Sequence, residues 1–504
     1  MTAGLLILIS KGEEDEYFTY NPSITFFKFV YKQHTNFSME SIKQQFNIQP
    51  DFGNRVSCTI SKHGDLIHKM YVVVSLPKIN FFQENSDLTN LNKCAWTHNI
   101  GWNIIKSVEL EIAGTVIDKQ YGDWLYINHE ISKKYISKNN DSFEQMIGNV
   151  PVLTELTNFK DDYTLYIPLN FWFCKYYGQS LPICALEFSD VKVNVEFSSL
   201  NDILILSPTN YIEIENSTTQ FNSGDILYQS INNSISYIKF VYLENRTDNT
   251  NRLYYSKITQ NPILSQTNDL QKYVYSIKSL DDKFYVYLKN SSSEQNHINK
   301  QKNFNWTKTL SIIDSFIYVD YIYLDFIERM KFITIPHTYL IETLSYDNDK
   351  LLSNSSSKIK MSYQNNCKEI FIRPQMNYLI SNNLCQLNNY MLDYFQNIDI
   401  INEIQFIMNG QDRTTLRNSK YFNLIQPFQH NSNSLNGIYC YSFSLFPENF
   451  QPSGSCNLSE MSDVQFNIVV NKNINYNNYA KIRIYAICYK ILKIENGRPY
   501  INLF

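Results

Sequence analysis

The segment SDVKVNVEF at Ser189–Phe197 recurs in altered form as SDVQFNIVV at Ser462–Val470. The opening Ser-Asp-Val and a later Asn are in register, and apolar side chains occupy alternate positions in both segments. Alternation with a period of two is typical of a β-strand that has one buried face. The sequence therefore predicts that one strand of the fold is present in two copies.

Further pairs of segments extend this repeat along the chain. Val108–Gly114 (VELEIAG) resembles Ile404–Gly410 (IQFIMNG), and each predicts a strand that runs into a glycine-containing turn. Downstream, Tyr318–Leu324 corresponds to Ile482–Tyr489. Because the segments keep the same order and the repeat has the length of a domain, we expect two tandem copies of one β-rich domain.

Length and composition agree with this organisation. The chain has 504 residues, whereas a single hydrophobic core stops growing at roughly 250–300 residues. The 38 Tyr and 32 Phe favour strands over helices. Many short strand patterns bounded by turn residues predict an all-β fold of β-sandwich or jelly-roll type, with one short helix near 124–135.

The two copies differ in length at one place. The span from Ser189 to Tyr318 is far longer than the corresponding span from Ser462 to Arg483, which predicts an insertion in the first copy only. Its richness in Asn, Ser and Thr suits an exposed excursion with its own small sheet, because long insertions are tolerated where loops meet solvent. The expected organisation is an N-terminal arm (1–25), a first copy (26–326) with the insertion (201–313), a helical or irregular connector (327–344) and a second copy (345–504).

Charge and cysteine usage exclude several classes of protein. A net charge of -4 provides no field that would hold a nucleic acid along the surface. The nine Cys are odd in number and lack Cys-x-x-Cys spacing, so we expect buried, reduced thiols in a cytosol-like compartment. No apolar run approaches 18 residues, and neither a membrane span nor a signal peptide is expected.

A short apolar run near the N-terminus precedes an acidic cluster at Glu13–Glu16. Such a run is a candidate to pair as an added strand with a neighbouring copy or an underlying protein, or to fold back on its own barrel. The sequence leaves both alternatives open. The candidate contact residues between assembled copies are Leu5, Leu6, Ile7, Leu8 and Ile9.

Catalytic and ligand-binding motifs are not found in the sequence. Phosphate-binding glycine loops, the Gly-x-Ser-x-Gly elbow and histidine pairs with metal-ligand spacing are missing. Asp123, Glu109 and Glu111 are conceivable glycosidase carboxylates, because jelly rolls also host carbohydrate enzymes. The stronger interpretation is that the two glutamates share the solvent side of one strand and that Asp123 lies in a turn beside a buried Trp124. We expect no catalytic, cofactor or metal site, and no enzyme.

Seven segments together resemble the double jelly-roll major capsid proteins of nucleocytoplasmic large DNA viruses. The bias toward Asn, Ile and Tyr is similar to that of the large members that infect amoebae. The insertion 201–313 and the ending at 495–499 have no counterpart in the family pattern. The resemblance is carried by Asn21–Phe37, Gly64–Tyr71, Tyr121–Leu125, Pro168–Cys174, Tyr318–Asp325, Tyr421–His430 and Gln451–Asn457.

The resemblance implies two eight-stranded jelly rolls per chain and a structural protein of the virion that is assembled in the host cytoplasm. Three chains would form a pseudo-hexagonal capsomer that tiles an icosahedral shell, with the insertion facing outward. The implied partners are the other copies of the homotrimer, neighbouring capsomers, minor capsid and penton proteins and, through minor proteins, an inner viral membrane, with no direct contact to nucleic acid.

Three further questions stay open from the sequence. The chain could be a minor or scaffold-like paralogue of the same fold. From a different class, it could be a carbohydrate-binding or carbohydrate-cleaving β-sandwich protein. Surface glycans are also an open matter, because five Asn-x-Ser/Thr sequons crowd the insertion, at Asn216, Asn232, Asn245, Asn290 and Asn305.

Overall fold

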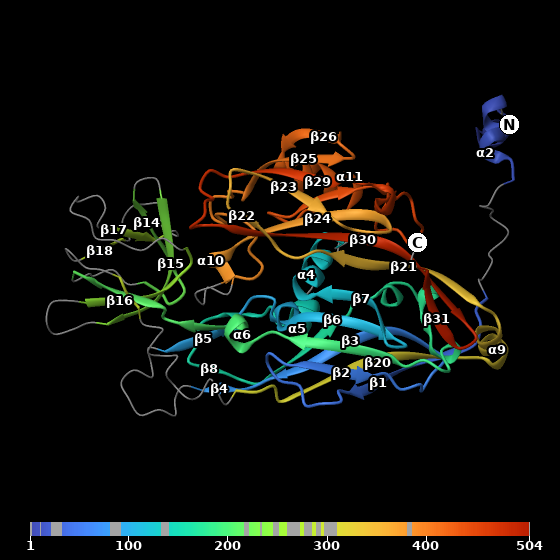
Figure 1. Cartoon of the computed structure of the whole chain (residues 1–504), viewed down its shortest axis with the longest axis horizontal. Coiled ribbons are helices and arrows are strands. Elements are labelled where there is room, and N and C mark those ends of the chain that lie inside the picture. Colours follow the sequence, from blue (N-terminus) through green and yellow to red (C-terminus); the bar gives the residue numbers. More distant parts are fainter. Residues whose placement is uncertain are drawn as a thin grey trace.

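Two similar β-sandwiches lie side by side along the molecule, and a further sheet projects from one end (Figure 1). The computed structural model of the chain describes residues 3–10, 12–21, 33–80, 92–132, 141–215, 221–231, 234–244, 251–259, 273–276, 285–288, 294–296, 310–380 and 386–502. The sequons of the insertion and residues 22–32 of the Asn21–Phe37 segment fall outside these ranges.

The first sandwich consists of two antiparallel sheets that enclose one hydrophobic core. One sheet has the order β1-β20-β3, with β9 and β10 both paired to β3, and the other has the order β2-β11-β6-β7. The strands are β1 (Phe37–Gln45), β2 (Arg55–Thr59), β3 (Leu66–Leu76), β6 (Ile105–Ile112), β7 (Thr115–Tyr121), β9 (Tyr163–Pro168), β10 (Leu181–Pro182), β11 (Val191–Phe197) and β20 (Asp314–Leu324).

The second sandwich repeats this order strand for strand. Its sheets run β21-β30-β24-β27 and β23-β29-β25-β26, so that β29 takes the place of β11 and β30 that of β20. Each sandwich thus has eight corresponding strands in two sheets, and the predicted all-β double jelly roll is confirmed. The strands are β21 (His337–Tyr346), β22 (Lys350–Leu352), β23 (Ser356–Met361), β24 (Asn366–Met376), β25 (Ile401–Met408), β26 (Gln411–Asn418), β27 (Tyr439–Ser442), β28 (Cys456–Asn457), β29 (Val464–Val470), β30 (Ala480–Glu495) and β31 (Arg498–Asn502).

The repeated sequence segments form the same hairpin in both sandwiches. β11 pairs with β6, and β29 pairs in the same way with β25. The hairpin consists of β6 and β7 in the first copy and of β25 and β26 in the second, and the turn between its strands has two residues with positive φ. These are Ala113 and Gly114 (φ 52° and 78°) in the first copy and Asn409 and Gly410 (φ 50° and 76°) in the second. Two positive φ values are the requirement of a type I′ turn, which matches the twist of the strands it joins.

Replacing Gly410 with alanine is expected to destabilise the second sandwich by about 1 kcal/mol, because a Cβ is disfavoured in the left-handed region. Steric contact would not contribute, since an added Cβ meets no atom within 4 Å. Gly178→Ala is the matched control, because its Cβ is equally free and its φ is not positive. Urea titration would measure both variants, and equal losses of stability would contradict the turn assignment.

The insertion folds into its own antiparallel sheet with its own small core, as predicted. The strand order is β18-β17-β14-β15-β16-β13-β19, and the core includes Leu227, Leu253 and Tyr255. β12 (Leu204–Ser207) pairs with β5 (Lys93–Trp96) where the insertion leaves the first sandwich. The other strands are β13 (Asn210–Ile214), β14 (Ile226–Ile231), β15 (Ser234–Glu244), β16 (Asn251–Lys257), β17 (Tyr273–Ser276), β18 (Tyr285–Tyr287) and β19 (Gln295–Asn296), and β4 (Ile79–Asn80) pairs with β8 (Phe159–Lys160) beside the first sandwich.

Helices occupy the ends and the space between the sandwiches. The helix expected near 124–135 is present as α4. The larger helices of the body are α3 (Ile100–Ile104), α4 (Gly122–Ile131), α5 (Asp141–Ile147), α9 (Phe326–Thr334) and α11 (Gln426–His430), and single turns are formed by α6 (Pro151–Thr154), α7 (Leu200–Ile203) and α10 (Asn377–Ile380).

The prediction for the connector was wrong in part. Residues 337–344, assigned to a helical or irregular connector, form most of β21, which pairs along β30. The alternating burial of Ile341 and Thr343 in this strand is the period-two signal that the connector assignment overlooked. β9 ends at Pro168, and Trp172–Cys174 form a 3-10 turn before β10. The remaining domain boundaries stay predictions.

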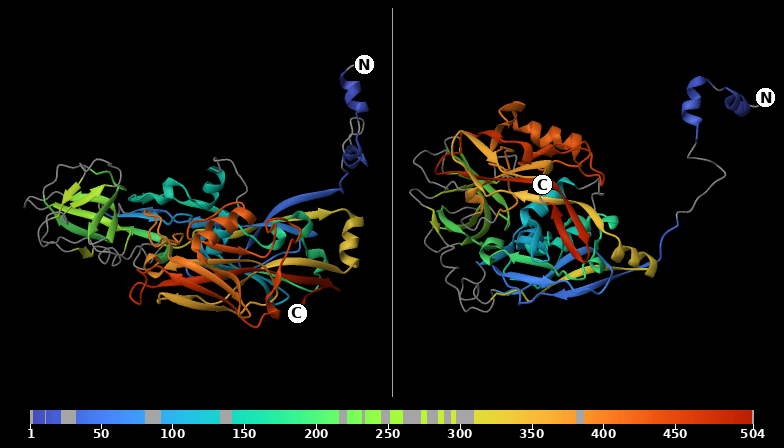
Figure 2. Two further views of the ribbon diagram at one scale, coloured as in Figure 1. Left: turned by 90° about the horizontal axis from the view of Figure 1, so that it is seen from above. Right: turned by 45° about the vertical axis from the view of Figure 1, so that its right-hand side comes forward.

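The molecule has two distinct ends. The sheet of the insertion projects at one end of the long axis, while α9, β31 and the N-terminal arm lie at the opposite end (Figures 1 and 2). This polarity separates the residues available for contacts at the two ends.

Candidate assembly surfaces

Helix α4 of the first sandwich packs against the second sandwich and forms an apolar seam between them (Figure 1). The Trp124 ring lies 5.2 Å from the ring of Phe371 on β24 and 5.2 Å from that of Tyr485 on β30. Gly122 starts this helix, where an added Cβ would overlap the backbone carbonyls of Ile105 and Trp102. Glycine is therefore required for α4 to reach the seam.

A charged network lies beside this apolar contact. Asp123 Oδ2 is 3.3 Å from Arg373 Nε and 3.1 Å from Arg483 Nη1, and the hydroxyl of Tyr485 donates to the same carboxylate at 2.9 Å. Arg483 also forms a bidentate ion pair with Asp349, in which Nε donates to Oδ1 at 2.7 Å and Nη2 donates to Oδ2 at 3.0 Å. Burial alone would raise the pKa of Asp123, but the two guanidinium groups hold this pKa below its usual range. Both sandwiches thus contribute to one ionic cluster.

A second ionic cluster joins the sandwiches through Glu342 on β21. Its carboxylate is 2.8 Å from Nζ of Lys175, which belongs to the first sandwich, and it also pairs with Lys368 on β24. Burial opposes ionisation of Glu342, yet the two ammonium groups lower its pKa to about 2. The neighbouring Glu369 has no such pair, and burial raises its pKa to about 7.

These contacts hold the two sandwiches as one block. Removing one partner from a buried ion pair leaves an uncompensated charge, so each cluster opposes separation or sliding of the sandwiches. In the first sandwich, Asp118 adds a further link, because its Oδ1 accepts a hydrogen bond at 2.9 Å from the backbone amide of Leu344 on β21.

The N-terminal arm is helical where the structure describes it. α1 (Ala3–Ile9) contains the five apolar candidate residues, and α2 (Glu13–Thr19) contains the acidic cluster. In the single chain these residues are therefore helical, and their pairing as an added strand with another copy or protein stays a prediction. The run AGLLILI includes helix-favouring Ala and Leu, whose propensity competes with its β-branched residues.

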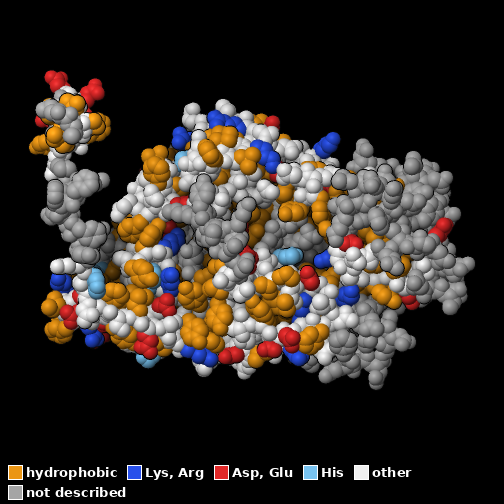
Figure 3. Space-filling model, turned by 180° about the vertical axis from the view of Figure 1, so that it is seen from behind, with side chains coloured by type: hydrophobic (Ala, Val, Ile, Leu, Met, Phe, Trp, Pro, Cys, Tyr) orange, Lys and Arg blue, Asp and Glu red, His pale blue; other side chains and the backbone are white. Residues whose placement is uncertain are grey.

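The apolar candidates of the arm are exposed to solvent. No residue of α1 is buried, and Ile7 is 74% exposed. Figure 3 shows the tip of the arm, with its hydrophobic and acidic side chains, standing clear of the body. The arm does not fold back on its own barrel in this structure. Contact of Leu5, Leu6, Ile7, Leu8 and Ile9 with another copy stays a prediction.

Helix α11 and the loop after β27 form an exposed apolar area on the flank of the second sandwich, which we call the α11 surface. Leu424 and Ile425 end the π-helical turn Tyr421–Ile425 that leads into α11, and Phe428 within α11 is 89% exposed. His430 Nδ1 lies 3.2 Å from the carbonyl oxygen of Leu445, which brings the loop beside the helix. The α11 surface consists of Leu424, Ile425, Phe428, Leu445, Phe446 and Phe450.

The α11 surface continues into the contact between the sandwiches. The ring of Phe450 lies 4.8 Å from that of Tyr176 in the first sandwich, whose hydroxyl donates to the backbone oxygen of Glu448 at 3.0 Å. Contiguous apolar areas of this kind mark interaction sites on soluble proteins. No pattern in the sequence indicated this surface, because its helix and loop are separated by a strand.

Helix α9 carries a second exposed apolar stripe at the end that also holds the arm. None of its residues is buried, although Arg329 anchors it through an ion pair of 3.0 Å with Asp65. The stripe consists of Phe326, Ile327, Met330, Ile333 and the adjoining Ile335.

The conceivable glycosidase carboxylates do not form a pair around an open site. Glu109 is 6% exposed and pairs with Arg55 and with Lys119, so it does not lie on the solvent side as predicted. Asp123 belongs to the seam. Glu111 accepts a hydrogen bond of 3.1 Å from Asn194 on the neighbouring strand.

Other candidate chemistry can be placed within the described ranges. There, no group of three or more His, Cys, Asp and Glu could hold a metal ion, and no helix is long and apolar enough to cross a membrane. Eight cysteines are free, and Cys385 falls outside the described residues.

Two family models match the sequence. The model for the major capsid protein N-terminus matches residues 25–244, and that for the large eukaryotic DNA virus major capsid protein matches residues 328–498. The chain is 36% identical to a probable capsid protein 4 of Acanthamoeba polyphaga mimivirus, over 98% of both chains. It is 28% identical to a major capsid protein of Phaeocystis pouchetii virus, over 99% of this chain and 98% of that one.

Solved structures share the fold at low sequence identity. The Faustovirus major capsid protein superposes with a TM-score of 0.65 at 12% identity, covering 96% of this chain and 94% of that one. A chain from a model of the PBCV-1 virus capsid gives a TM-score of 0.62 at 21% identity, covering 95% and 100%.

Proposed function

This chain belongs to the large eukaryotic DNA virus major capsid protein family and is a structural protein of the virus capsid, and from that premise we propose that it acts as a homotrimer. Three chains would supply six similar sandwiches, which form a pseudo-hexagonal capsomer that tiles an icosahedral shell. The role is mechanical and not enzymatic.

The α11 surface is the observation that carries this proposal. A closed ring of three copies needs a head-to-tail contact, in which one surface of a copy meets a different surface of the next. Six large apolar side chains exposed on one flank, continuous with the contact inside the chain, suit such a permanent interface, which is more apolar than the average surface.

A double variant with Phe428→Asp and Phe446→Asp is expected to abolish trimer formation. Both side chains are more than half exposed, so the charges cost little in the isolated chain but would be buried unpaired at the interface. Light scattering during gel filtration would measure the mass, which should be three times 59.4 kDa for the natural chain and 59.4 kDa for the variant.

Tyr476→Asp serves as the control, because Tyr476 is as exposed as Phe428 but lies outside the α11 surface. This variant should remain trimeric. A natural chain that stays monomeric would overturn the trimer, while a trimeric double variant would show that a different surface forms it.

The two ends of the block suit different partners. We assign the end with the arm and the α9 stripe to the inside of the shell, where it would contact minor capsid proteins and, through them, an inner membrane. Leu5–Ile9 would reach a neighbouring capsomer, and penton proteins would close the vertices. The insertion would face outward. Assembly would take place in the host cytoplasm.

Whether the chain is the abundant subunit or a minor paralogue is decided by copy number. We propose that the chain is the abundant subunit. Its copy number would be measured against the other proteins of purified particles, and a few copies per particle would assign it to the minor class.

A further inference from the structure

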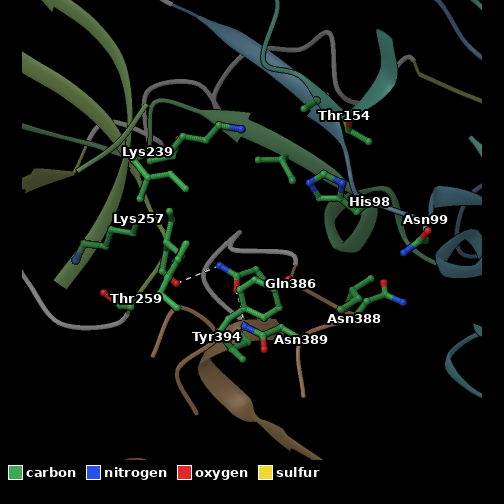
Figure 4. A pocket seen from close by; sticks show the side chains of 18 of the residues that line it. His98, Asn99, Thr154, Lys239, Lys257, Thr259, Gln386, Asn388, Asn389 and Tyr394 are labelled. Carbon is green, nitrogen blue, oxygen red and sulfur yellow. Dashed lines mark hydrogen bonds between the residues drawn. The ribbon is translucent and has the colours of Figure 1, made fainter. Parts of the chain in front are cut away.

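A cavity of about 600 Å³ lies where the insertion meets both sandwiches (Figure 4). Its lining residues come from three separate parts of the chain: Ala95 to Leu156 contribute seven described residues of the first sandwich, and the others belong to the insertion and to the second sandwich. We call it the junction cavity. Its volume falls within the roughly 300–1,000 Å³ that is usual for small-molecule sites.

One wall of the junction cavity is cationic. Figure 4 shows Lys239 of β15 extending toward His98 of the first sandwich. Lys239 has no ion-pair partner in the part of the chain that the structure describes, and burial lowers its pKa, with only Glu155 acting in the opposite direction. An anion bound beside Lys239 would restore the stabilisation that burial removes.

The other charged groups of the wall are already engaged. Lys257 pairs with Glu294 at 2.6 Å. Asp393 Oδ1 accepts hydrogen bonds from the backbone amides of Phe395 and Gln396, at 2.9 and 3.1 Å. Among the described lining residues, Lys239 therefore carries a positive charge that has no ion-pair partner, although Asp393 keeps its negative charge.

The opposite wall consists of amides and aromatic rings. Gln386, Asn388 and Asn389 lie there beside Tyr394 (Figure 4). Asn388 Oδ1 accepts a hydrogen bond of 2.6 Å from Asn103, but the Nδ2 group of Asn388 is buried and has no partner among the described residues. Side-chain amides can donate and accept at once, which suits a ligand that carries several hydroxyl groups.

We propose that the junction cavity binds an acidic saccharide, a sugar ring that carries a carboxylate or a sulfate. The anionic group lies against Lys239, where a charge-assisted hydrogen bond forms. A ring hydroxyl accepts from the Nδ2 group of Asn388, since the amides of Gln386 and Asn389 already bond to each other and to the backbone. The apolar face of the sugar rests on the ring of Tyr394, because aromatic rings offer a flat apolar surface. The junction cavity shares no lining residue with the α11 surface.

Saturation-transfer NMR with glucuronate and the full-length chain would test the proposal. We expect Lys239→Gln to weaken glucuronate binding about tenfold, as the loss of one charged hydrogen bond would. Tyr394→Ala should also weaken binding, and since Tyr394 is 65% exposed its removal should leave the fold intact. Lys358→Gln is the matched control, because Lys358 is an exposed lysine on β23, far from the cavity walls.

Two further ligands separate the parts of the site. Glucose has the ring without the charge, and inorganic sulfate has the charge without the ring, so both should bind more weakly than glucuronate. The proposal is overturned if glucuronate does not bind, if Lys239→Gln binds it as well as the natural chain does, or if either of the two simpler ligands binds equally well. The mass of the Lys239→Gln variant would also be measured. If this variant is still a trimer, a loss of glucuronate binding cannot be caused by a failure of assembly.

Discussion

Replacing Asp123 with alanine is expected to destabilise the chain by about 3–5 kcal/mol, because removing one partner of a buried ion pair leaves a buried charge uncompensated. The carboxylate is shared by Arg373 and Arg483, and Arg373 is 8% exposed, so water could not replace the lost partner. We expect the contacts at the seam to be weakened first, because the hydroxyl of Tyr485 also loses its hydrogen-bond acceptor there. Urea titration followed by tryptophan fluorescence would measure it, because Trp124 reports on the same seam.

Asp314→Ala is the matched control for this variant. Asp314 pairs with Lys43 at 3.2 Å, but both side chains are largely exposed, and such pairs contribute only about 0–1 kcal/mol. If the Asp123 variant lost no more stability than this control, the network would not hold the sandwiches together.

Replacing Glu369 with glutamine is expected to stabilise the chain above neutral pH by up to about 3 kcal/mol, at 1.36 kcal/mol per pKa unit. Burial raises the pKa of Glu369 from 4.5 to about 7, while Lys368 and Asn431 oppose the shift and Glu342 and Glu448 add to it. The folded chain therefore binds a proton more tightly than the unfolded chain. The cost of Glu369 is absent below pH 4.5, grows between pH 4.5 and 7, and is complete above 7.

Glutamine keeps the acceptor that Asn431 uses at 3.0 Å and removes only the charge. Titrations at pH 5 and pH 8, with the natural chain and the variant at equal concentration, would test the prediction. The advantage of the variant should be small at pH 5 and large at pH 8. An advantage that does not change with pH would contradict the assigned pKa. Glu342 does not interfere, because its pKa of about 2 lies below this range.

The repeat in the sequence was sufficient to predict two tandem copies of one β-rich domain, and the family resemblance specified the double jelly roll. Alternating residues place β11 and β29 in the sheet centres, and the glycines at 114 and 410 mark the same hairpin turn. Alternation and turn glycines are local features of the sequence, so they can be read without knowledge of the rest of the chain. The insertion followed from a comparison of lengths within the chain itself.

The assembly surfaces could not be predicted in the same way. Trp124 and Asp123 meet partners at 371, 373, 483 and 485, and nothing local to either residue indicates this pairing. The α11 surface likewise depends on a loop that returns beside the helix after β27. At the N-terminus, the apolar run of α1 was compatible with strand or helix, since a short run has no decisive period.

The ionic clusters of the seam have a consequence for the geometry of a shell. Asp123 of the first sandwich meets both Arg373 and Arg483 of the second, so a slip by a single residue would leave Asp123 facing the wrong groups. The chain therefore behaves as a stiff tile. Any bending that a closed particle of large radius requires must then be accommodated between chains and not within them.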